Sequence, residues 1–165
     1  MFFLVINFVT KVMKLNESKI RPYDYLKYWK VVRQFIKIKH KLTQADLDIL
    51  FFLYTEKYFT KTKFDEFNVV LGWNPIRFGK LLKNGWIESI SGKQGLKRKY
   101  YQLSNRGVRV VNTAYKLLNG EEMPMTVNRN PIFGKTTRYT DRVLRNFIAE
   151  MNKDLRNKKY DNIML

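Results

Sequence analysis

The alternation of apolar and polar positions divides the chain into several helical segments and one hairpin. Over residues 23–41 the apolar positions recur every three or four residues, which predicts an amphipathic helix with a Lys-rich opposite face. Further helices are predicted from Thr43, from Thr60 or Thr62, and from Asn74, because these side chains can cap a first turn. The core positions expected in the first two helices are Leu26, Trp29, Val32, Phe35, Ile36, Leu47, Ile49, Leu50, Leu53 and Tyr54.

Two short helices follow each other closely in the middle of the chain. The segments 63–71 and 74–84 are separated by Gly72 and Trp73, which is the length and break of a helix-turn-helix pair. Pro75 fits the first turn of the second helix, where its missing N–H has no partner to lose. In this second helix we expect Ile76, Phe78, Leu81 and Leu82 to face the core and Arg77, Lys80, Lys83 and Asn84 to face outward.

A β-hairpin is predicted directly after the helix pair. Residues 86–90 and 99–103 alternate as strands, and residues 91–95 supply Ser and Gly for a turn. The expected fold class is therefore mainly α with a small β-hairpin wing (α+β). It is a winged helix-turn-helix flanked by N- and C-terminal helices.

The C-terminal part of the chain is predicted to be a helix, a loop and a second helix. Ser104 opens a helix that ends at Asn119 and Gly120. The last helix needs a partner for its apolar side, and either a dimer mate or the helix from Tyr23 would serve. That apolar side contains Val143, Leu144, Phe147, Ile148, Met151 and Leu155. The expected units are an apolar N-terminal segment (1–22), a winged-helix domain (23–120), a linker or arm (121–139) and a C-terminal helix for dimerisation or interaction (140–165).

The first 13 residues are strongly apolar but do not have the pattern of an export signal. A secretory signal places Lys or Arg ahead of the apolar run, whereas the first Lys here is Lys11. The run is also shorter than the roughly 20 apolar residues that span a bilayer. We expect a dimer-contacting or core-packing segment, or an upstream start codon with the working start at Met13, and no membrane partner.

The charge of the chain favours a polyanionic partner. The sequence has 32 basic and 14 acidic residues, a net charge of +18, which far exceeds what solubility requires. Its 45% apolar content shows that the chain can bury a core and is not a disordered basic tail. Between residues 74 and 110 nine Lys or Arg accompany a single acid, Glu88, so we expect double-stranded DNA to be the partner.

The expected DNA contacts fall into base-reading and phosphate-binding groups. Asn74 and Arg77 are candidates for base readout because Asn pairs with adenine and Arg with guanine, although Asn74 fits a purely capping role equally well. Lys80 and Lys83 are expected to contact phosphates, and Asn84 lies on the same face. The wing candidates are Lys93, Gln94, Lys97, Arg98 and Lys99. Weaker phosphate contacts are expected at Lys63, Arg106 and Arg109.

The central part of the chain resembles a known family. The run KLLKNGWIE at 80–88, followed after the hairpin by YQLSNRG at 101–107, is similar to the MarR family of winged-helix transcription regulators, and the resemblance covers residues 23–120. It implies a homodimer formed by the N- and C-terminal helices. Each protomer would place one helix in the major groove and one wing tip in the minor groove. It also implies a cytoplasmic, nucleoid-associated protein.

The wing departs from the family's pattern. Members usually carry Asp-x-Arg there, with the Asp bracing an Arg that enters the minor groove, whereas this chain has Gly95 and Lys97, followed by Arg98. The basic side chains of the wing still attract phosphates, but without the Asp a basic side chain is held less firmly in position to enter the minor groove. Members also respond to small phenolic ligands or to cysteine oxidation. The second is excluded because the chain has no Cys, and no residue identifies a small-molecule effector.

Catalysis, metals and cofactors are not expected. His40 is the single His and has no acidic residue at a metal-ligand spacing, so we expect it to be structural or solvent-facing. The sequence has no phosphate-binding Gly-Lys-Ser/Thr loop and no His-Glu-x-x-His motif. Two functions remain: a sequence-specific dimeric regulator, or a structural or packaging protein that binds nucleic acid non-specifically through its winged helix, alone or within a larger assembly.

Overall fold

The structure is a computed structural model that describes residues 25–90, 99–135 and 138–161. The helices are α2 (Tyr25–His40), α3 (Gln44–Glu56), α4 (Lys61–Leu71), α5 (Ile76–Lys83), α6 (Asn105–Leu118) and α7 (Tyr139–Asp161), with a 3-10 turn η1 (Pro131–Phe133). The strands β1 (Tyr58–Phe59), β2 (Ile87–Ile90) and β3 (Tyr100–Leu103) form an antiparallel sheet in the order β1-β3-β2. The predictions for residues 1–22 and for Lys93, Gln94, Gly95, Lys97 and Arg98 lie outside the described residues.

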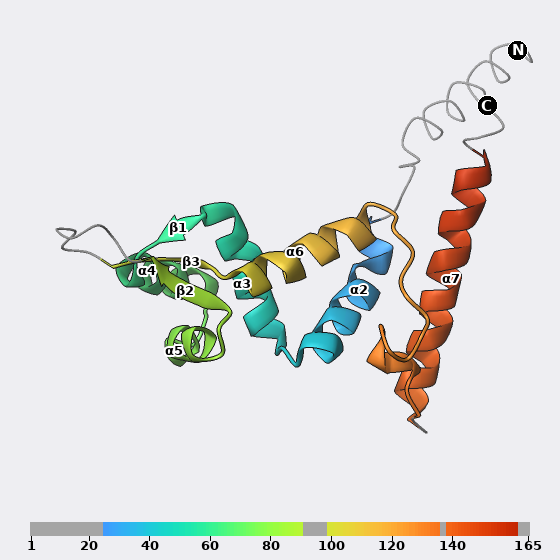
Figure 1. The fold of residues 1–165 in the computed structure, drawn as a ribbon, viewed down its shortest axis with the longest axis horizontal. Coiled ribbons are helices and arrows are strands. Elements are labelled where there is room, and N and C mark those ends of the chain that lie inside the picture. The colour runs from blue at the N-terminus through green and yellow to red at the C-terminus, as the bar shows by residue number, and fades with distance from the viewer. Residues whose placement is uncertain (1–24, 91–98, 136–137, 162–165) are drawn as a thin grey trace, which may run out of the picture.

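The element order confirms the predicted winged helix-turn-helix. In Figure 1, α4, α5 and the sheet lie at one end of the molecule and α7 lies at the other, with α3, α6 and α2 between them. Helix α4 ends at Gly72, which adopts the left-handed conformation (φ 65°), and Pro75 is already helical (φ −53°, ψ −32°). These two residues produce the break that separates the paired helices.

The helix starts are set by the predicted caps. The hydroxyl of Thr43 accepts a hydrogen bond from the backbone N of Asp46, whose carboxylate accepts in return from the backbone N of Thr43, so α3 opens with a capping box. Of the two threonines considered for α4, Thr60 is the cap and accepts from the backbone N of Lys63 at 3.1 Å. Helix α6 is capped by Ser104 in the same way.

Strand β1 is an element that the sequence pattern did not predict. It has only two residues, Tyr58 and Phe59, which pair with Gln102 and Tyr101 of β3. A strand this short shows no alternation that a sequence reading can detect. It joins the connection between α3 and α4 to the edge of the hairpin, so the wing is held to the helix pair.

The core is built mainly where the apolar pattern placed it. Helix α3 buries Leu47, Ile49, Leu50 and Leu53, all four as expected. In α2 the prediction for Leu26 is wrong, because its side chain is 76% exposed. The buried stripe of α2 begins at Tyr28. Leu26, two positions earlier, lies about 200° away around the helix and therefore points away from the core.

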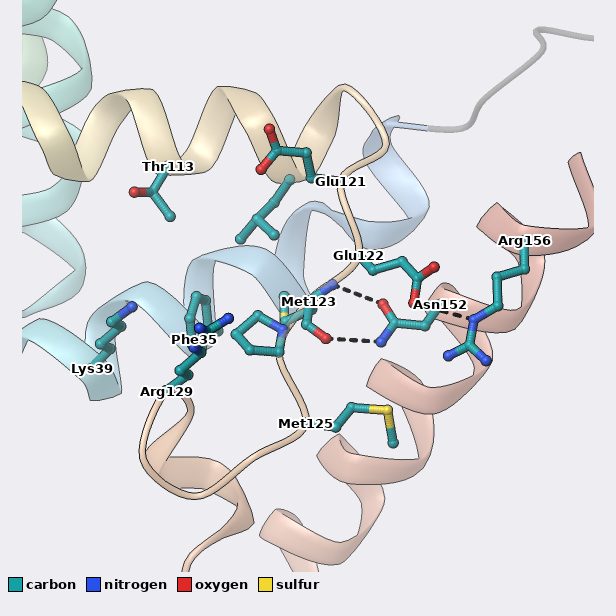
Figure 2. A pocket seen from close by; sticks show the side chains of 12 residues that line it. Phe35, Lys39, Thr113, Glu121, Glu122, Met123, Met125, Arg129, Asn152 and Arg156 are labelled. Carbon is teal, nitrogen blue, oxygen red and sulfur yellow. Dashed lines mark hydrogen bonds and ion pairs between the residues drawn. The ribbon is translucent and has the colours of Figure 1, made fainter. Parts of the chain in front are cut away.

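The segment between α6 and α7, which was expected to be a linker or arm, is packed into the fold. Met123 and Ile132 are buried, and the side chain of Asn152 in α7 binds both the backbone N and the backbone O of Met123 at 2.8 Å (Figure 2). The side chain of Asn130, also buried, accepts from the N of Ile132 at 3.1 Å. Side chains bonded to backbone hold this segment, which explains why it has no hydrophobic period.

Helix α7 packs along α2 within the same chain. Its buried apolar residues, among the side chains that the structure describes, are Ile148, Met151 and Leu155, three members of the predicted apolar side. Of the two partners considered, the helix that was predicted from Tyr23 covers this side of α7. Phe147, also predicted on this side, is 46% exposed.

The start of α6 is clamped onto the turn after α5. The hydroxyl of Ser104 donates to the carbonyl of Gly85 at 2.7 Å, and its backbone N donates to the carbonyl of Trp86 at 3.0 Å. A Cβ at Gly107 would lie 2.8 Å from that same Trp86 carbonyl oxygen, closer than real Cβ atoms approach. Only glycine therefore fits at this position of the LSNRG run.

We expect Gly107→Ala to lower the free energy of unfolding by about 1–3 kcal/mol, because the added methyl group overpacks against a backbone atom that cannot rotate away. Urea denaturation followed by circular dichroism measures the change. Asn105→Ala is the matched control, since Asn105 is exposed in the same helical turn. A Gly107→Ala protein as stable as the control would contradict the close approach.

Candidate nucleic-acid interface

Helix α5 presents a continuous face to the outside of the molecule. Residues on this face recur at spacings of three and four, while Phe78 and Leu81 on the other side are buried. We define the outward face as Ile76, Gly79, Lys80 and Lys83, all exposed. The core prediction is right for Phe78 and Leu81 and wrong for Ile76, which is 66% exposed, and for Leu82, which is 38% exposed.

The two lysines of this face keep their charges directed at solvent. Neither Lys80 nor Lys83 forms an ion pair with any residue that the structure describes. Asn84, also exposed, is the C-terminal cap of the helix. A phosphate would therefore meet two ammonium groups with no acidic partner to displace.

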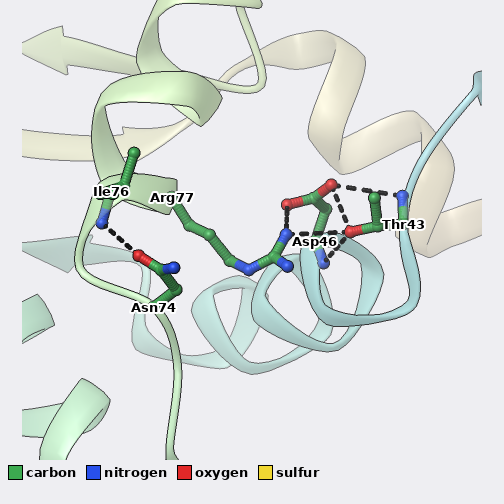
Figure 3. Close-up of polar contacts among 5 residues, drawn as sticks. All are labelled: Thr43, Asp46, Asn74, Ile76 and Arg77. Atoms are coloured by element: carbon green, nitrogen blue, oxygen red, sulfur yellow. Dashed lines mark hydrogen bonds and ion pairs between the residues drawn. The ribbon is translucent and has the colours of Figure 1, made fainter.

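Asn74 performs the capping role. Its Oδ1 accepts a hydrogen bond from the backbone N of Ile76 at 2.9 Å, and its backbone carbonyl accepts from the N of Arg77 at 2.9 Å (Figure 3). These bonds fix the first turn of α5. Base readout by Asn74 stays a prediction and would use the amide nitrogen, which forms no hydrogen bond with a described residue.

Arg77 points inward, contrary to the expectation that it faces outward. Its Nη1 donates to Oδ1 of Asp46 at 2.6 Å and to Oγ1 of Thr43 at 2.9 Å, and only 26% of its side chain is exposed (Figure 3). Arg77 reaches the N-terminus of α3, and the facing carboxylate lies 31 positions earlier in the sequence. Helical spacing alone could not reveal this partner.

This contact lowers the pKa of the Asp46 carboxylate. Burial alone would raise the pKa of Asp46, but hydrogen bonds from Thr43 and Arg77 outweigh burial and hold the pKa below its ordinary value of 3.8. A depressed folded-state pKa stabilises the fold above the unfolded-state pKa, and this stability is lost as pH falls through the folded-state value. The pair therefore fixes α5 on α3 at neutral pH.

We expect Asp46→Asn to lower the free energy of unfolding by about 1–2 kcal/mol at neutral pH, because Arg77 loses a charged acceptor that is largely buried. The difference from wild type should shrink as pH falls below 3.8, where wild-type Asp46 also takes up a proton. Urea denaturation across a pH series measures both effects. Asp48→Asn, an exposed acid of the same helix, is the control, and a deficit independent of pH would contradict the ionic role.

Arg106 stacks on the turn that follows α5. Its guanidinium carbon lies 3.8 Å from the centre of the Trp86 ring, and its Nη1 donates to the carbonyl of Asn84 at 3.3 Å. His40 contacts the same ring edge-on at 6.2 Å, in agreement with a structural role. Burial lowers the pKa of His40, and the nearby charges of Lys39 and Arg106 lower it further. A phosphate contact by Arg106 stays a prediction.

The remaining phosphate candidates differ in how they are paired. Lys63 binds Glu66 at 2.8 Å, whereas Lys99 and Arg109 are exposed and have no ion pair with a described residue. Lys99, at the start of the returning wing strand, lies beside the first turn of α4. A surface depression of about 510 Å³ is lined there by Thr60, Lys61, Thr62, Lys63, Glu66, Lys99 and Tyr101.

In residues 25–90, 99–135 and 138–161, no three His, Asp or Glu side chains gather as metal ligands. Over the same ranges no helix combines the length and apolarity needed to cross a bilayer.

Comparisons with known proteins return solved structures only. No protein-family model and no curated protein matches the chain. Reduced MarR from E. coli is similar with a TM-score of 0.42 and 14% identity, over 56% of this chain and 68% of that chain. A mutant E. coli MarR complexed with operator DNA is similar with a TM-score of 0.40 and 14% identity, over 72% of this chain and 81% of that chain. Wild-type apo MarR from E. coli is similar with a TM-score of 0.40 and 15% identity, over 54% of this chain and 66% of that chain. The winged-helix assignment rests on the order and packing of this chain's own elements.

Proposed function

We propose that this chain is a DNA-binding transcription regulator of MarR-like type, which places α5 in the major groove and its basic hairpin in or near the minor groove. The observation that carries the proposal is the outward face of α5, where exposed Lys80 and Lys83 have no ion-pair partner among the described residues. A short helix with this face fits a major groove, and the net charge of +18 supplies long-range attraction. Such a protein would act on the nucleoid, in the cytoplasm.

The contacts divide between positioning and reading. Lys80, Lys83, Lys99 and Arg109 are exposed cations that would hold phosphates. Arg77 acts differently, because its bonds to Asp46 and Thr43 hold the helix in place. We therefore assign Arg77 a positioning role.

A non-specific packaging function is the second candidate. Two observations favour it: the excess of 18 positive charges, and the inward orientation of Arg77, which removes the side chain best suited to read guanine. A packaging protein would bind all sequences with nearly equal affinity and depend steeply on salt. A regulator would prefer an inverted repeat with half-sites about one helical turn apart.

Titration of fluorescent duplexes at low and moderate salt distinguishes the two functions. Duplexes of random sequence are compared with duplexes enriched by repeated selection on the full chain. A regulator should bind the selected duplex at least ~10³ times more tightly than random DNA. Equal affinity at both salt concentrations would overturn the regulator and leave the packaging function.

We expect Lys83→Ala to weaken binding to every duplex alike and to reduce the slope of log affinity against log salt by about one unit, because one phosphate contact is lost. Lys153→Ala, which removes an exposed lysine of α7 at the far end of the molecule, is the control and should leave the slope unchanged. Equal slopes for both variants would contradict a phosphate contact by Lys83.

We further propose that the working form is a homodimer joined through α2 and α7. A groove of about 540 Å³ runs between these helices, lined in part by Val143, Leu144 and Phe147. Tyr139 at the start of α7 is 72% exposed and Phe147 is 46% exposed, so the apolar surface continues past the contact with α2. A second copy of the same helices is the occupant that two-fold symmetry offers.

We expect Phe147→Glu to convert the dimer to a monomer, because a carboxylate would be buried without a partner in the interface. Sedimentation equilibrium of the full chain measures the mass. Asn146→Glu adds the same charge at the adjacent exposed position and should leave the dimer intact. A wild-type chain that sediments as a monomer would overturn the dimer.

A further inference from the structure

Ile76 is an exposed apolar residue at the first position of the outward face. Its side chain is 66% exposed and lies about 200° around α5 from buried Phe78, so it takes no part in the core. The N-terminal turn of a recognition helix is the part that meets base edges. In the major groove the apolar group on offer is the C5 methyl of thymine.

Gly79 lies one turn further along the same outward face. Glycine in the interior of a helix is destabilising relative to alanine, and so it needs a reason. The fold does not supply one, because a Cβ at Gly79 would have no described atom within 4 Å. The missing side chain leaves room outside the protein, between Ile76 and Lys83, where the helix backbone can approach another molecule closely.

One polar candidate for base reading, Arg77, does not lie on this face. Arg77 is bonded to Asp46 and Thr43, and its guanidinium points toward α3. Lys80 and Lys83 are suited to the flanking phosphates. Ile76 and Gly79 are thus the groups of the outward face left to meet base edges.

We infer that α5 recognises thymine through contact of Ile76 with the C5 methyl group in the major groove, and that Gly79 permits the close approach of the helix that this contact requires. The inference rests on the proposed DNA binding and specifies its chemistry. It assigns the sequence preference to an apolar contact, because long-range attraction between charges cannot supply such a preference. The preferred duplexes are rich in thymine.

The test removes only the methyl group from the DNA. Fluorescence anisotropy of the full chain compares a short alternating dA·dT duplex with the same duplex containing deoxyuridine in place of thymidine. Wild type should bind the uracil duplex about fourfold more weakly, the factor for burial of one methyl group. An alternating dG·dC duplex should in turn gain affinity when 5-methylcytosine places a methyl group at the equivalent position.

Variants at Ile76 and Gly79 test whether these two residues cause the difference in affinity between the thymine and uracil duplexes. Ile76→Ala should bind both A/T duplexes equally, whereas Val127→Ala, which shortens a residue 57% exposed between α6 and η1, should keep the wild-type difference. Gly79→Ala should raise the urea midpoint of unfolding and still weaken binding to the dA·dT duplex about tenfold. A gain in stability with a loss of binding separates contact with DNA from a structural role of Gly79.

The possible failures can be told apart. Equal affinity of wild type for the thymine and uracil duplexes would overturn the inference and leave DNA binding in place. Unchanged binding by Gly79→Ala would overturn the close approach at α5. Absence of binding to every duplex at low salt would overturn the proposed function and this inference together.

Discussion

The contact of Arg77 with Asp46 and Thr43 determines how the recognition helix is presented. Helix α5 has only eight residues and a small buried side, so its orientation depends on bonds to its neighbours. Asp46 also forms the capping box of α3, and one carboxylate therefore starts one helix and anchors another. Because Arg77 is directed inward by this contact, the outward face consists of Ile76 and the residues that follow it at helical spacing.

The sequence was sufficient to predict those structural features that depend only on residues close together in the chain. Caps such as Thr43 and Ser104 act on backbone within three residues, and the stop at Gly72 follows from its own conformation, so a pattern of residue types predicts them. The same holds for the helix-turn-helix pair and the hairpin strands. The outward position of Arg77 could not be predicted correctly, because its partner is distant in sequence and becomes a neighbour only after α3 and α5 pack.

The segment after α6 shows a second limit of pattern analysis. Hydrophobic periodicity detects elements that bury one apolar side. Met123 is held instead by the side chain of Asn152 and Ile132 by the side chain of Asn130, each through bonds to backbone atoms. Polar residues in a loop are typical of solvent exposure, so nothing in the composition distinguishes this segment from a free linker. The contact between its backbone and α7 makes it part of the C-terminal packing.

The two sides of α5 share no residue, and this separation bears on how related proteins diverge. The inward side, with Phe78, Leu81 and Arg77, carries the packing and the anchor. The side chains of Ile76, Lys80 and Lys83 on the outward face are exposed and take no part in the core, so folding does not constrain substitutions at these three positions. A lineage can therefore exchange Ile76 and acquire a new binding preference in a single step, without passing through an unstable intermediate protein.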